Sequence, residues 1–360
     1  MTYDFLVVGA GIFGATFARV AADAGRSVLV VDRRGHVGGN CFSEEIEGVE
    51  VHRYGPHIFH TSDERVWAFV NRFARFNNFV NSPRARVDGR IFSFPLNLLT
   101  MHQLWGVTTP DEARRKLDEV RVPCAAPRNM EEWLLSQVGP EIYELFFRGY
   151  TKKQWGTEPR DLPAGTARRL PFRLTFDDNY YRDRRQGIPE DGYGELFRRM
   201  LEGIDVELGC DYLERREELR PRARRVLYTG AVDEFHGRAL GPLRYRSLRF
   251  ESRVFDGDFQ GNAVVNYPSP DVPFTRIVEH KHFARPDAPR TVVTWEFPAD
   301  CAPGDEPFYP LGGAADRALY ERYRALPADV VFGGRLGLYE YLDMDRAAAR
   351  ALDLAKELLA

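Results

Sequence analysis

Residues 3–25, YDFLVVGAGIFGATFARVAADAG, combine a short apolar run, a glycine turn and an alanine-rich segment that ends at Gly25. The apolar run has the character of a strand, and the alanine-rich part has the apolar spacing of a helix. Residues 26–34, RSVLVVDRR, add a second apolar run that ends at Asp32. A strand, a helix and a second strand in this order predict a parallel sheet with a right-handed crossover.

The glycine turn carries Gly9, Gly11 and Gly14 in the spacing G-x-G-x-x-G. The first glycine allows a tight turn, the second lets the backbone approach a pyrophosphate, and the third allows close packing of helix on strand. The N-terminus of the helix offers free N–H groups to the phosphates. Asp32 is placed to hold ribose hydroxyls, which favours an adenosine without a 2′-phosphate. The alternative is a glycine turn that binds no ligand.

NAD and FAD share this adenosine-binding device, so the glycine turn alone does not separate them. Residues 33–40, RRGHVGGN, follow the acid with a glycine pair. This stretch resembles the second glycine motif of the FAD-binding families related to amine oxidases, and it therefore favours FAD. A plain turn between two strands is the alternative.

Composition indicates a globular protein, with 44% hydrophobic and 29% charged residues among 360. A chain of this length is expected to form two or three structural units. The net charge of −3 leaves no basic field for nucleic acid, so we predict no nucleic-acid partner. Five Lys and 45 Arg make up the basic residues, and arginine suits phosphate groups, so single arginines must be judged by position.

The four cysteines Cys41, Cys124, Cys210 and Cys301 lie far apart. Their spacing argues against a zinc site and against a disulfide framework, so we predict reduced thiols and no metal. No signal-peptide pattern and no stretch of about 20 apolar residues is present, which predicts a cytoplasmic protein without a membrane partner.

The pattern of apolar residues and turn signals along the rest of the chain predicts an α/β fold. In this fold a Rossmann-like FAD-binding domain carries an inserted helical subdomain and an antiparallel sheet subdomain. Helical spacing dominates from about 81 to 178, and β-branched runs between turn signals dominate from about 243 to 300. Residues 156–171 lack periodicity and predict a mobile connection. The expected division is 1–80, 190–242 and 301–360 for the FAD domain, 81–178 for the helical substrate and lid subdomain, and 179–189 with 243–300 for the sheet subdomain.

Eleven further motifs occur along the chain in a fixed order: GGN, YGPHIFHT, NSP, GYTKKQWG, FDDNYY, QGIP, YRSLRFE, QGNAVVNY, FTRIVEHKHF, DEPFYP and FGGRLGLYEYLDM. With them the chain resembles the UDP-galactopyranose mutase family over residues 3 to about 350. The resemblance implies a flavoenzyme that interconverts UDP-galactopyranose and UDP-galactofuranose, with N5 of reduced FAD as the nucleophile at the anomeric carbon. It also implies a nucleotide-sugar substrate, a cellular reductant and, as one expected state, a homodimer.

The resemblance assigns catalytic roles to three residues. Arg173 and Arg276 match the two arginines that clamp the diphosphate, a task for which the planar guanidinium is suited. His57 lies, by resemblance, with its main chain close to flavin N5. Its neighbour His60 is three residues away, but a metal pair would need further ligands that the sequence does not supply. His60 is left either structural or functional.

Further assignments follow from the same resemblance. The predicted substrate contacts are Asn81, Phe146, Tyr150, Thr151, Trp155, Tyr180, Asn266, Tyr309 and Tyr341. The predicted cofactor contacts are Gly9, Gly11, Phe13, Gly14, Asp32, Arg33, Gly39, Asn40, His57, Ile58, Arg246, Arg335, Asp343 and Met344. Packing at the rim of the site is the alternative for Tyr309, Tyr341, Arg246 and Arg335. For the aromatic residues between 146 and 155 the alternative is a helix that packs them into the core, and for Asn81 it is a turn.

Several positions depart from the family pattern and put the identity of the sugar in doubt: Tyr181, Glu190, Asp191, Trp295, Leu338, Leu342 and Asp345. One alternative is therefore the same ring contraction on a 6-deoxy or N-acetylated nucleotide sugar in a specialised pathway. Another is an FAD oxidoreductase of the amine-oxidase type, which shares the glycine motifs but does not need two diphosphate arginines. A flavin-binding protein without activity would lack one of those arginines, and both are present.

Overall fold

The computed structural model describes residues 2–168, 171–302 and 304–360. Its first sheet is parallel and has the strand order β16-β10-β1-β2-β9. The strands are β1 (Tyr3–Val8), β2 (Val28–Asp32), β9 (Asp205–Leu208), β10 (Ala223–Tyr228) and β16 (Val331–Phe332). The apolar run of the opening stretch forms the central strand, with Leu6 opposite Leu29 of β2 and opposite Val226 of β10.

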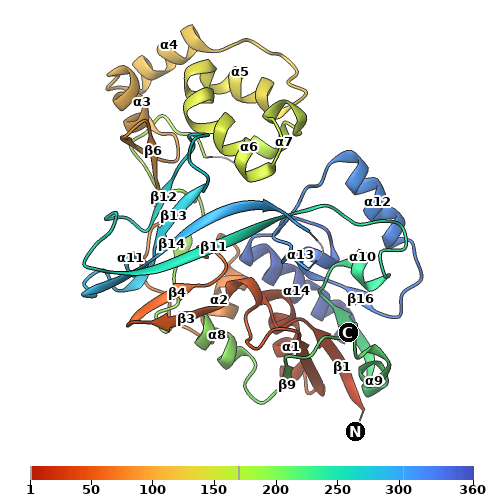
Figure 1. Ribbon diagram of the computed structural model, residues 1–360. Coiled ribbons are helices and arrows are strands. Elements are labelled where there is room, and N and C mark those ends of the chain that lie inside the picture. Colours follow the sequence, from red (N-terminus) through yellow and green to blue (C-terminus); the bar gives the residue numbers. More distant parts are fainter. Residues whose placement is uncertain (1, 169–170, 303) are drawn as a thin grey trace.

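Two alanine-rich helices cover one face of this sheet, α1 (Ile12–Asp23) and α14 (Met344–Leu359). Ala15 and Ala18 of α1 share one buried core with Ala348 and Ala351 of α14. Small side chains let the two helix backbones approach closely. As a result the C-terminal helix completes the domain that the N-terminal strand begins, and Figure 1 shows the two helices together beside β1.

The second sheet has seven strands in the order β15-β11-β14-β13-β12-β6-β7. Its strands are β6 (Arg84–Val87), β7 (Arg90–Ser93), β11 (Tyr245–Asp256), β12 (Val264–Asn266), β13 (Arg276–Glu279), β14 (Arg290–Asp300) and β15 (Tyr309–Pro310). The long antiparallel pair β11 and β14 crosses the middle of the molecule, with the parallel sheet on one side and a helical lobe on the other (Figure 1).

The helical lobe contains α3 (Leu98–Trp105), α4 (Pro110–Val120), α5 (Met130–Ile142), the π-helix η2 (Tyr143–Arg148), α6 (Gly149–Trp155), η3 (Pro159–Asp161) and α7 (Gly165–Arg168). Its core joins Leu134 and Ile142 of α5 to Ala85 and Phe92 of the β6–β7 hairpin. The stretch predicted as a mobile connection contains η3 and α7, and residues 169 and 170 lie outside the described part.

The remaining elements complete the chain. They are η1 (Gly39–Cys41), β3 (Ser43–Ile46), β4 (Val49–His52), β5 (Phe59–Thr61), α2 (Glu64–Val70), β8 (Arg185–Gly187), α8 (Gly192–Met200), α9 (Arg216–Leu219), η4 (Arg220–Arg222), α10 (Val232–Phe235), α11 (Lys281–Ala284), α12 (Ala314–Arg324) and α13 (Gly334–Gly337). Within the described ranges, no helix has the length and apolar character that crossing a membrane requires.

The predicted fold class is confirmed, but three stretches differ from the expected division. Residues 309–310, expected in the FAD domain, form β15 and pair with β11 of the second sheet. Residues 84–93, expected in the helical part, form the hairpin β6–β7 at one edge of the seven-stranded sheet. Alternation of Ala85 and Val87 with outward arginines gives them strand periodicity over only four residues. Residues 185–187, expected in that sheet, pair with β5 instead. The partner of so short a strand is set by tertiary packing.

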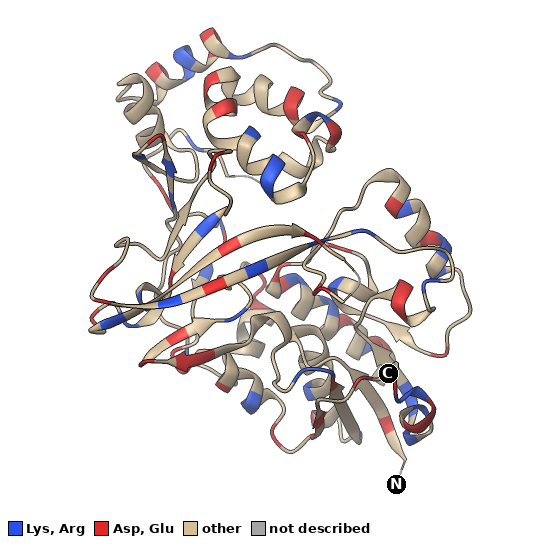
Figure 2. Cartoon of the chain, viewed as in Figure 1, with Lys and Arg blue, Asp and Glu red and all other residues tan. Residues whose placement is uncertain are grey.

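Residues of both charge signs are interspersed along the helices and the strands (Figure 2). Helix α4, for example, carries acidic and basic residues side by side. Mixed charge of this kind agrees with the net charge of −3.

Candidate active site

A cavity of about 740 Å³ lies where the parallel sheet, the second sheet and the helical lobe meet. This volume is within the range of about 300–1,000 Å³ that ligand pockets occupy. The glycine turn, η1, the turn before β5, α6, β12, β13, α13 and the start of α14 all contribute to its wall. Every residue that the sequence assigned to cofactor, substrate or catalysis lines this cavity, except Arg173 and Arg246.

The three glycines of the turn have different reasons to be glycine. A Cβ atom on Gly14 would lie 1.9 Å from the carbonyl oxygen of Gly9, and one on Gly9 would lie 2.0 Å from Oγ1 of Thr229. A Cβ atom on Gly11 meets only Gly39, at 3.8 Å. Contacts within the protein therefore require glycine at positions 9 and 14. At Gly11 the missing side chain leaves room on the side of the cavity, where a ligand phosphate would pass.

Asp32 is buried at the end of β2, where both of its carboxylate oxygens accept hydrogen bonds. Oδ2 accepts from the backbone N–H of Ala10 at 2.7 Å, and Oδ1 accepts from that of Arg34 at 2.9 Å. The carboxylate thus ties the glycine turn to the second strand. Each oxygen keeps a lone pair for a ribose hydroxyl, so the geometry is compatible with the predicted contact.

The cavity wall also holds buried polar atoms that suit a cofactor with phosphates and polar ring edges. Nδ2 of Asn40 and Nε of Arg335 are buried and have no hydrogen-bond partner among the described residues. Burial lowers the pKa of Arg335, which is the sign of a cation placed where an anion would stabilise it. Helix α14 begins at the wall with Met344 and has no side-chain cap at Asp343. The N–H of Arg346 donates to Oδ1 of Asp345 at 2.7 Å, so the N–H groups of Met344 and Asp345 are the ones that a ligand could use. These donors fit a flavin dinucleotide.

His57 lines the cavity from the turn before β5. Its Nδ1 lies 2.8 Å from the carbonyl oxygen of Gly55. Because a carbonyl only accepts, Nδ1 carries the proton and Nε2 is an acceptor. Burial, together with the nearby Arg335 and Arg276, lowers the pKa of His57 to about 4. The imidazole is therefore neutral and can accept a proton or a hydrogen bond at the cavity.

Two further histidines, which the sequence analysis did not single out, support the main chain of His57. The backbone N–H of His57 donates to Nδ1 of His52 at 3.1 Å, and the backbone N–H of His52 donates to Nδ1 of His280 at 3.2 Å. His280 in turn bonds Oγ1 of Thr294 at 2.9 Å. Burial lowers the pKa of His280 to about 3 and also lowers that of His52. Two consecutive neutral imidazoles, those of His52 and His280, therefore support the turn that faces the cavity.

Arg276, at the start of β13, is the charged centre of the second half of the cavity. Its Nε lies 3.3 Å from Oε1 of Glu296, which is 1% exposed, and its Nη2 donates to the hydroxyl of Tyr150 at 2.9 Å. Burial acts against the charge, but the neighbouring carboxylate of Glu296 raises the pKa of Arg276 above its ordinary value. A permanent, oriented cation of this kind suits a diphosphate.

Aromatic rings line the same cavity as this cation. Tyr309 and Tyr341 stack with ring centroids 5.7 Å apart and planes 18° apart, and Trp155 lies 6.4 Å from Tyr309. Phe146 is fully buried and packs edge-on against Phe92, so it supports the lobe as well as the wall. Flat aromatic walls beside a cation match a base joined to a diphosphate.

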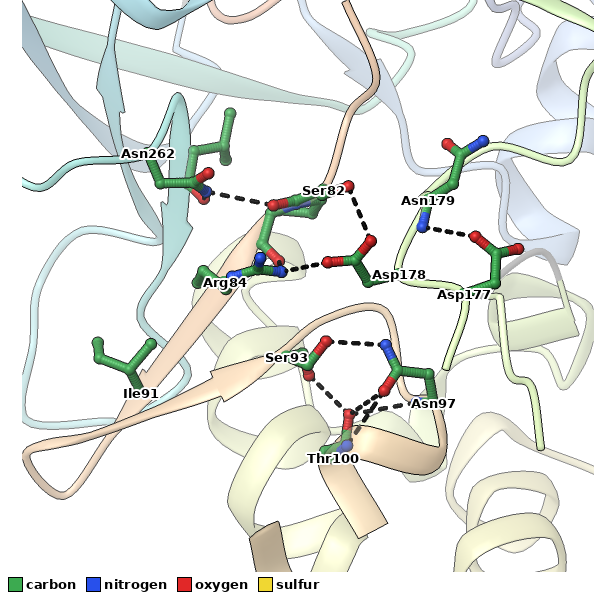
Figure 3. A network of polar contacts seen from close by, with 12 residues as sticks. Ser82, Arg84, Ile91, Ser93, Asn97, Thr100, Asp177, Asp178, Asn179 and Asn262 are labelled. Carbon is green, nitrogen blue, oxygen red and sulfur yellow. Dashed lines mark hydrogen bonds and ion pairs between the residues drawn. The ribbon is translucent and has the colours of Figure 1, made fainter. Parts of the chain in front are cut away.

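The structure does not bring Arg173 to the cavity wall. Its guanidinium bonds the carbonyl oxygens of Asn179 and Tyr181 and forms an ion pair with Asp177 at 3.2 Å. Figure 3 shows how this loop is held, because Asp178 accepts hydrogen bonds from Ser82 at 3.1 Å and from Arg84 at 2.8 Å. In this arrangement the diphosphate role predicted for Arg173 would require the side chain to leave its carbonyls.

Arg246 also lies outside the cavity wall. It is buried against the C-terminal end of α6, where it donates to the carbonyl oxygens of Gln154 at 3.0 Å and Lys153 at 3.1 Å, and it forms an ion pair with Asp300. The expectation of a cofactor contact therefore does not match its position. Basic side chains stabilise the exposed carbonyls at a helix end. Gly156, which follows Trp155 with a φ of 67°, marks the end of α6 in the sequence, but nothing local indicates that Arg246 lies beside it.

Glu306 is a wall residue that the sequence analysis missed, although it lies inside the quoted motif DEPFYP. Its carboxylate forms ion pairs with Arg33 at 3.0 Å and with Arg34 at 2.6 Å. It thereby orients the two arginines that follow Asp32. Only tertiary structure places residue 306 beside residue 33.

His60 lines the cavity as well. Its Nδ1 lies 2.7 Å from Oδ2 of Asp183, and its ring stacks on that of Tyr181 at 3.7 Å. Among the positions that depart from the family pattern, Tyr181 and Leu342 line the cavity. Asp345 accepts from Thr61 at 3.2 Å, and Trp295 packs among Phe255 and Phe259 on the second sheet. Two altered side chains are thus in reach of a ligand.

Comparison with known proteins agrees with the family resemblance of the sequence motifs. A sequence profile of UDP-galactopyranose mutase matches residues 145–341, and one of the NAD(P)-binding Rossmann-like domain matches residues 7–73. A probable UDP-galactopyranose mutase of Klebsiella pneumoniae is 42% identical over 367 residues, with 99% of this chain and 94% of the relative covered. A dTDP-fucopyranose mutase of Escherichia coli is 39% identical and covers 98% and 97%.

The fold is also found among solved structures. A reduced UDP-galactopyranose mutase matches with a TM-score of 0.76 at 16% identity, with 99% of this chain and 96% of that chain covered. At so low an identity the match speaks for the fold alone. Function must therefore rest on the sequence relatives and on the cavity.

Proposed function

Because the chain belongs to the UDP-galactopyranose mutase family, we propose that it is a flavin-dependent isomerase that interconverts UDP-galactopyranose and UDP-galactofuranose. The observation that carries the proposal is that one cavity joins the glycine turn to the buried cation Arg276. A dinucleotide cofactor and a substrate diphosphate can therefore meet in it. The relatives agree in being mutases of nucleotide sugars, and their names describe isomerases.

Reduced FAD, when bound, supplies the nucleophile through N5, so the protein needs no nucleophilic side chain. The cofactor contacts named above, apart from Arg246, are the residues that would hold it, with Asp32 toward the ribose and with Nδ2 of Asn40 and Nε of Arg335 as unpaired donors. The main chain at His57 would face the flavin ring. His52 and His280 keep that main chain in place through the hydrogen bonds described above.

Arg276 has the task of stabilising the leaving group. When the bond between the anomeric carbon and the diphosphate breaks, negative charge grows on the phosphate oxygens, and a cation already in position lowers the barrier. Glu296 and Tyr150 fix the guanidinium before substrate arrives. Burial raises the pKa of Tyr309, so its hydroxyl stays protonated and can donate to the same oxygens.

Arg173 is proposed as the second diphosphate cation. In its present position it bonds the carbonyls of the 177–181 loop and pairs with the exposed carboxylate of Asp177. We infer that a bound diphosphate draws it away, since a bidentate bond to phosphate is stronger than bonds to neutral carbonyls, and an exposed ion pair contributes little. Tyr150, Thr151 and Trp155 of α6 would form the wall for the uracil ring, with Asn81, Tyr180 and Asn266 as further contacts.

A second candidate substrate is a 6-deoxy nucleotide sugar. Leu342 lines the cavity in a position where an aromatic residue is common, and an aliphatic side chain suits a methyl group better than a hydroxymethyl group. The relative named dTDP-fucopyranose mutase is nearly as similar as the one named probable UDP-galactopyranose mutase, at 39% against 42%. An N-acetylated sugar remains a third alternative.

The decisive experiment is a chromatographic panel of UDP-, dTDP- and GDP-sugars with the purified yellow protein, before and after reduction with dithionite. We expect ring interconversion only after reduction. Equal turnover with oxidised flavin would reject the mechanism, and absence of turnover on every nucleotide sugar would reject the function. Turnover of dTDP-fucose in place of UDP-galactose would select the 6-deoxy alternative.

The physiological reductant and a homodimeric state are proposed from the family resemblance alone. Light scattering of the purified holoenzyme measures its mass in solution, and a mass of one chain would contradict the dimer. Stopped-flow reduction with NADH and NADPH would show whether a nicotinamide serves as the reductant.

A further inference from the structure

Lys153 makes an unusual set of contacts next to the cavity. Its ammonium lies 2.5 Å from the carbonyl oxygen of Tyr267, 2.9 Å from those of Ser269 and Val272, and 3.0 Å from that of Phe274. No ion pair joins it to a carboxylate of the described residues. Burial lowers its pKa to about 8. A desolvated ammonium is thus held by neutral carbonyls alone.

These carbonyls belong to a single turn, residues 267–275, which connects β12 to β13. The turn follows Asn266 and precedes Arg276, both of which line the cavity. A lysine ammonium has three N–H donors, and in this cage all of them are directed to the turn. The position of the turn therefore depends on where α6 holds the ammonium.

Helix α6 is also seated directly on this turn. A Cβ atom on Gly149 would lie 2.5 Å from the carbonyl oxygen of Pro268, so only glycine lets the helix approach this closely. At its other end, Arg246 donates to the carbonyl oxygens of Lys153 and Gln154. The helix that carries Tyr150, Thr151 and Trp155 is therefore fixed at both ends.

The neighbouring lysine provides a contrast within the same helix. Lys152 is exposed and forms an ion pair with Glu158 at 2.7 Å. An exposed ion pair of this kind contributes little to stability. The two adjacent lysines therefore differ in burial and in partners, although they have the same side chain and the same helix.

We propose that Lys153 is a positioning residue of the nucleotide site, which locks α6 onto the β12–β13 turn and so sets Tyr150 and Arg276 at the spacing that a nucleoside diphosphate requires. This inference rests on the proposed function. Lys153 does not line the cavity, so it is not proposed to contact the substrate. Its effect passes through the turn to Arg276 on one side and through the helix to Tyr150 on the other.

The test is the affinity of the flavin-loaded protein for UDP and for dTDP, measured by calorimetry for wild type, Lys153→Met and the matched control Lys152→Met. We expect the Kd for the nucleotide to rise at least tenfold in Lys153→Met and to change less than twofold in Lys152→Met. The flavin content per protein, measured as the ratio of flavin to protein absorbance, should be unchanged in both. A lysine with a merely structural role would lower the melting temperature but leave the Kd of the folded holoenzyme unchanged, and that result would overturn the proposal.

Two further measurements test the proposal, one on a more conservative variant and one on the wild type. Lys153→Gln retains two N–H donors without the charge, and we expect it to bind with an affinity between those of wild type and Lys153→Met. If neither variant folds, hydrogen exchange on the wild type decides: UDP should slow exchange in residues 267–275 and in α6 together, and protection of one without the other would overturn the proposal. Failure of the wild type to bind either nucleotide would instead reject the proposed function.

Discussion

The guanidinium of Arg276 donates a hydrogen bond of 2.9 Å to the hydroxyl of Tyr150, although 126 positions separate the two residues in the chain. This bond joins strand β13 of the second sheet to helix α6 of the helical lobe. On its other side Arg276 is paired with the buried carboxylate of Glu296. The cation is therefore oriented by two partners from different elements before any ligand arrives, which is what preorganised electrostatic stabilisation requires.

Arg276→Ala is expected to lower kcat by about 10²–10³-fold, the loss usually seen when one preorganised group is removed from a developing charge. The flavin should remain bound, because Arg276 is proposed as a substrate contact and not as a cofactor contact. Steady-state kinetics with reduced enzyme and the flavin spectrum of the variant measure the two effects. Near wild-type turnover would show that the diphosphate lies elsewhere.

Arg173→Ala tests a cation that the structure places on loop carbonyls. If Arg173 moves to the diphosphate, the variant should lose turnover by about 10²-fold or more and keep its flavin. Arg84→Ala is a suitable control, because Arg84 holds the same loop through Asp178 at 2.8 Å and does not line the cavity. Equal effects of the two substitutions would indicate that only the stability of the loop matters.

Gly11→Ala and Gly14→Ala should differ in kind. An added methyl group on Gly11 has room within the protein, with Gly39 at 3.8 Å, so this variant should fold but lose most of its flavin. On Gly14 the methyl group would overlap the Gly9 carbonyl at 1.9 Å, so that variant should fail to fold. Circular dichroism and flavin content of the purified proteins separate the outcomes. A folded, flavin-loaded Gly11→Ala protein would contradict the assignment of this turn.

The buried histidines predict a loss of stability in acid. The folded-state pKa values of His57 and His280 are lowered to about 4 and about 3 from 6.5, so the unfolded chain binds more protons than the folded one between these values. The free energy of unfolding should therefore fall as pH decreases from 6.5 to about 4, by up to about 1.4 kcal/mol per pH unit for each such histidine.

Urea unfolding across this pH range measures the effect. His280→Asn should reduce the slope of stability against pH, because the variant lacks one group that the unfolded state protonates. The control His102→Asn removes an exposed histidine and should leave the slope unchanged. If both variants kept the wild-type slope, carboxylates alone would account for the acid sensitivity.

Local features of the sequence predicted much of this protein. The run from Tyr3 to Gly25 predicted a strand, a turn and a helix because each depends on neighbours a few residues away. The ordered motifs predicted the family, which the relatives confirm. All but two of the proposed site residues line one cavity, because motifs of a family keep their positions in a shared fold.

Tertiary structure alone decided the rest. The strand pairing of β6 with β12 and the ion pair of Glu306 with Arg33 join segments far apart in the chain. Three further features have no local signature in the sequence. They are the position of Arg246 at the end of α6, the four carbonyl oxygens around Lys153, and the hydrogen bonds that link His57 to His52 and His52 to His280. Side-chain type and spacing fix what a segment can form by itself, but the partner of a buried charge depends on which distant backbone the fold brings beside it.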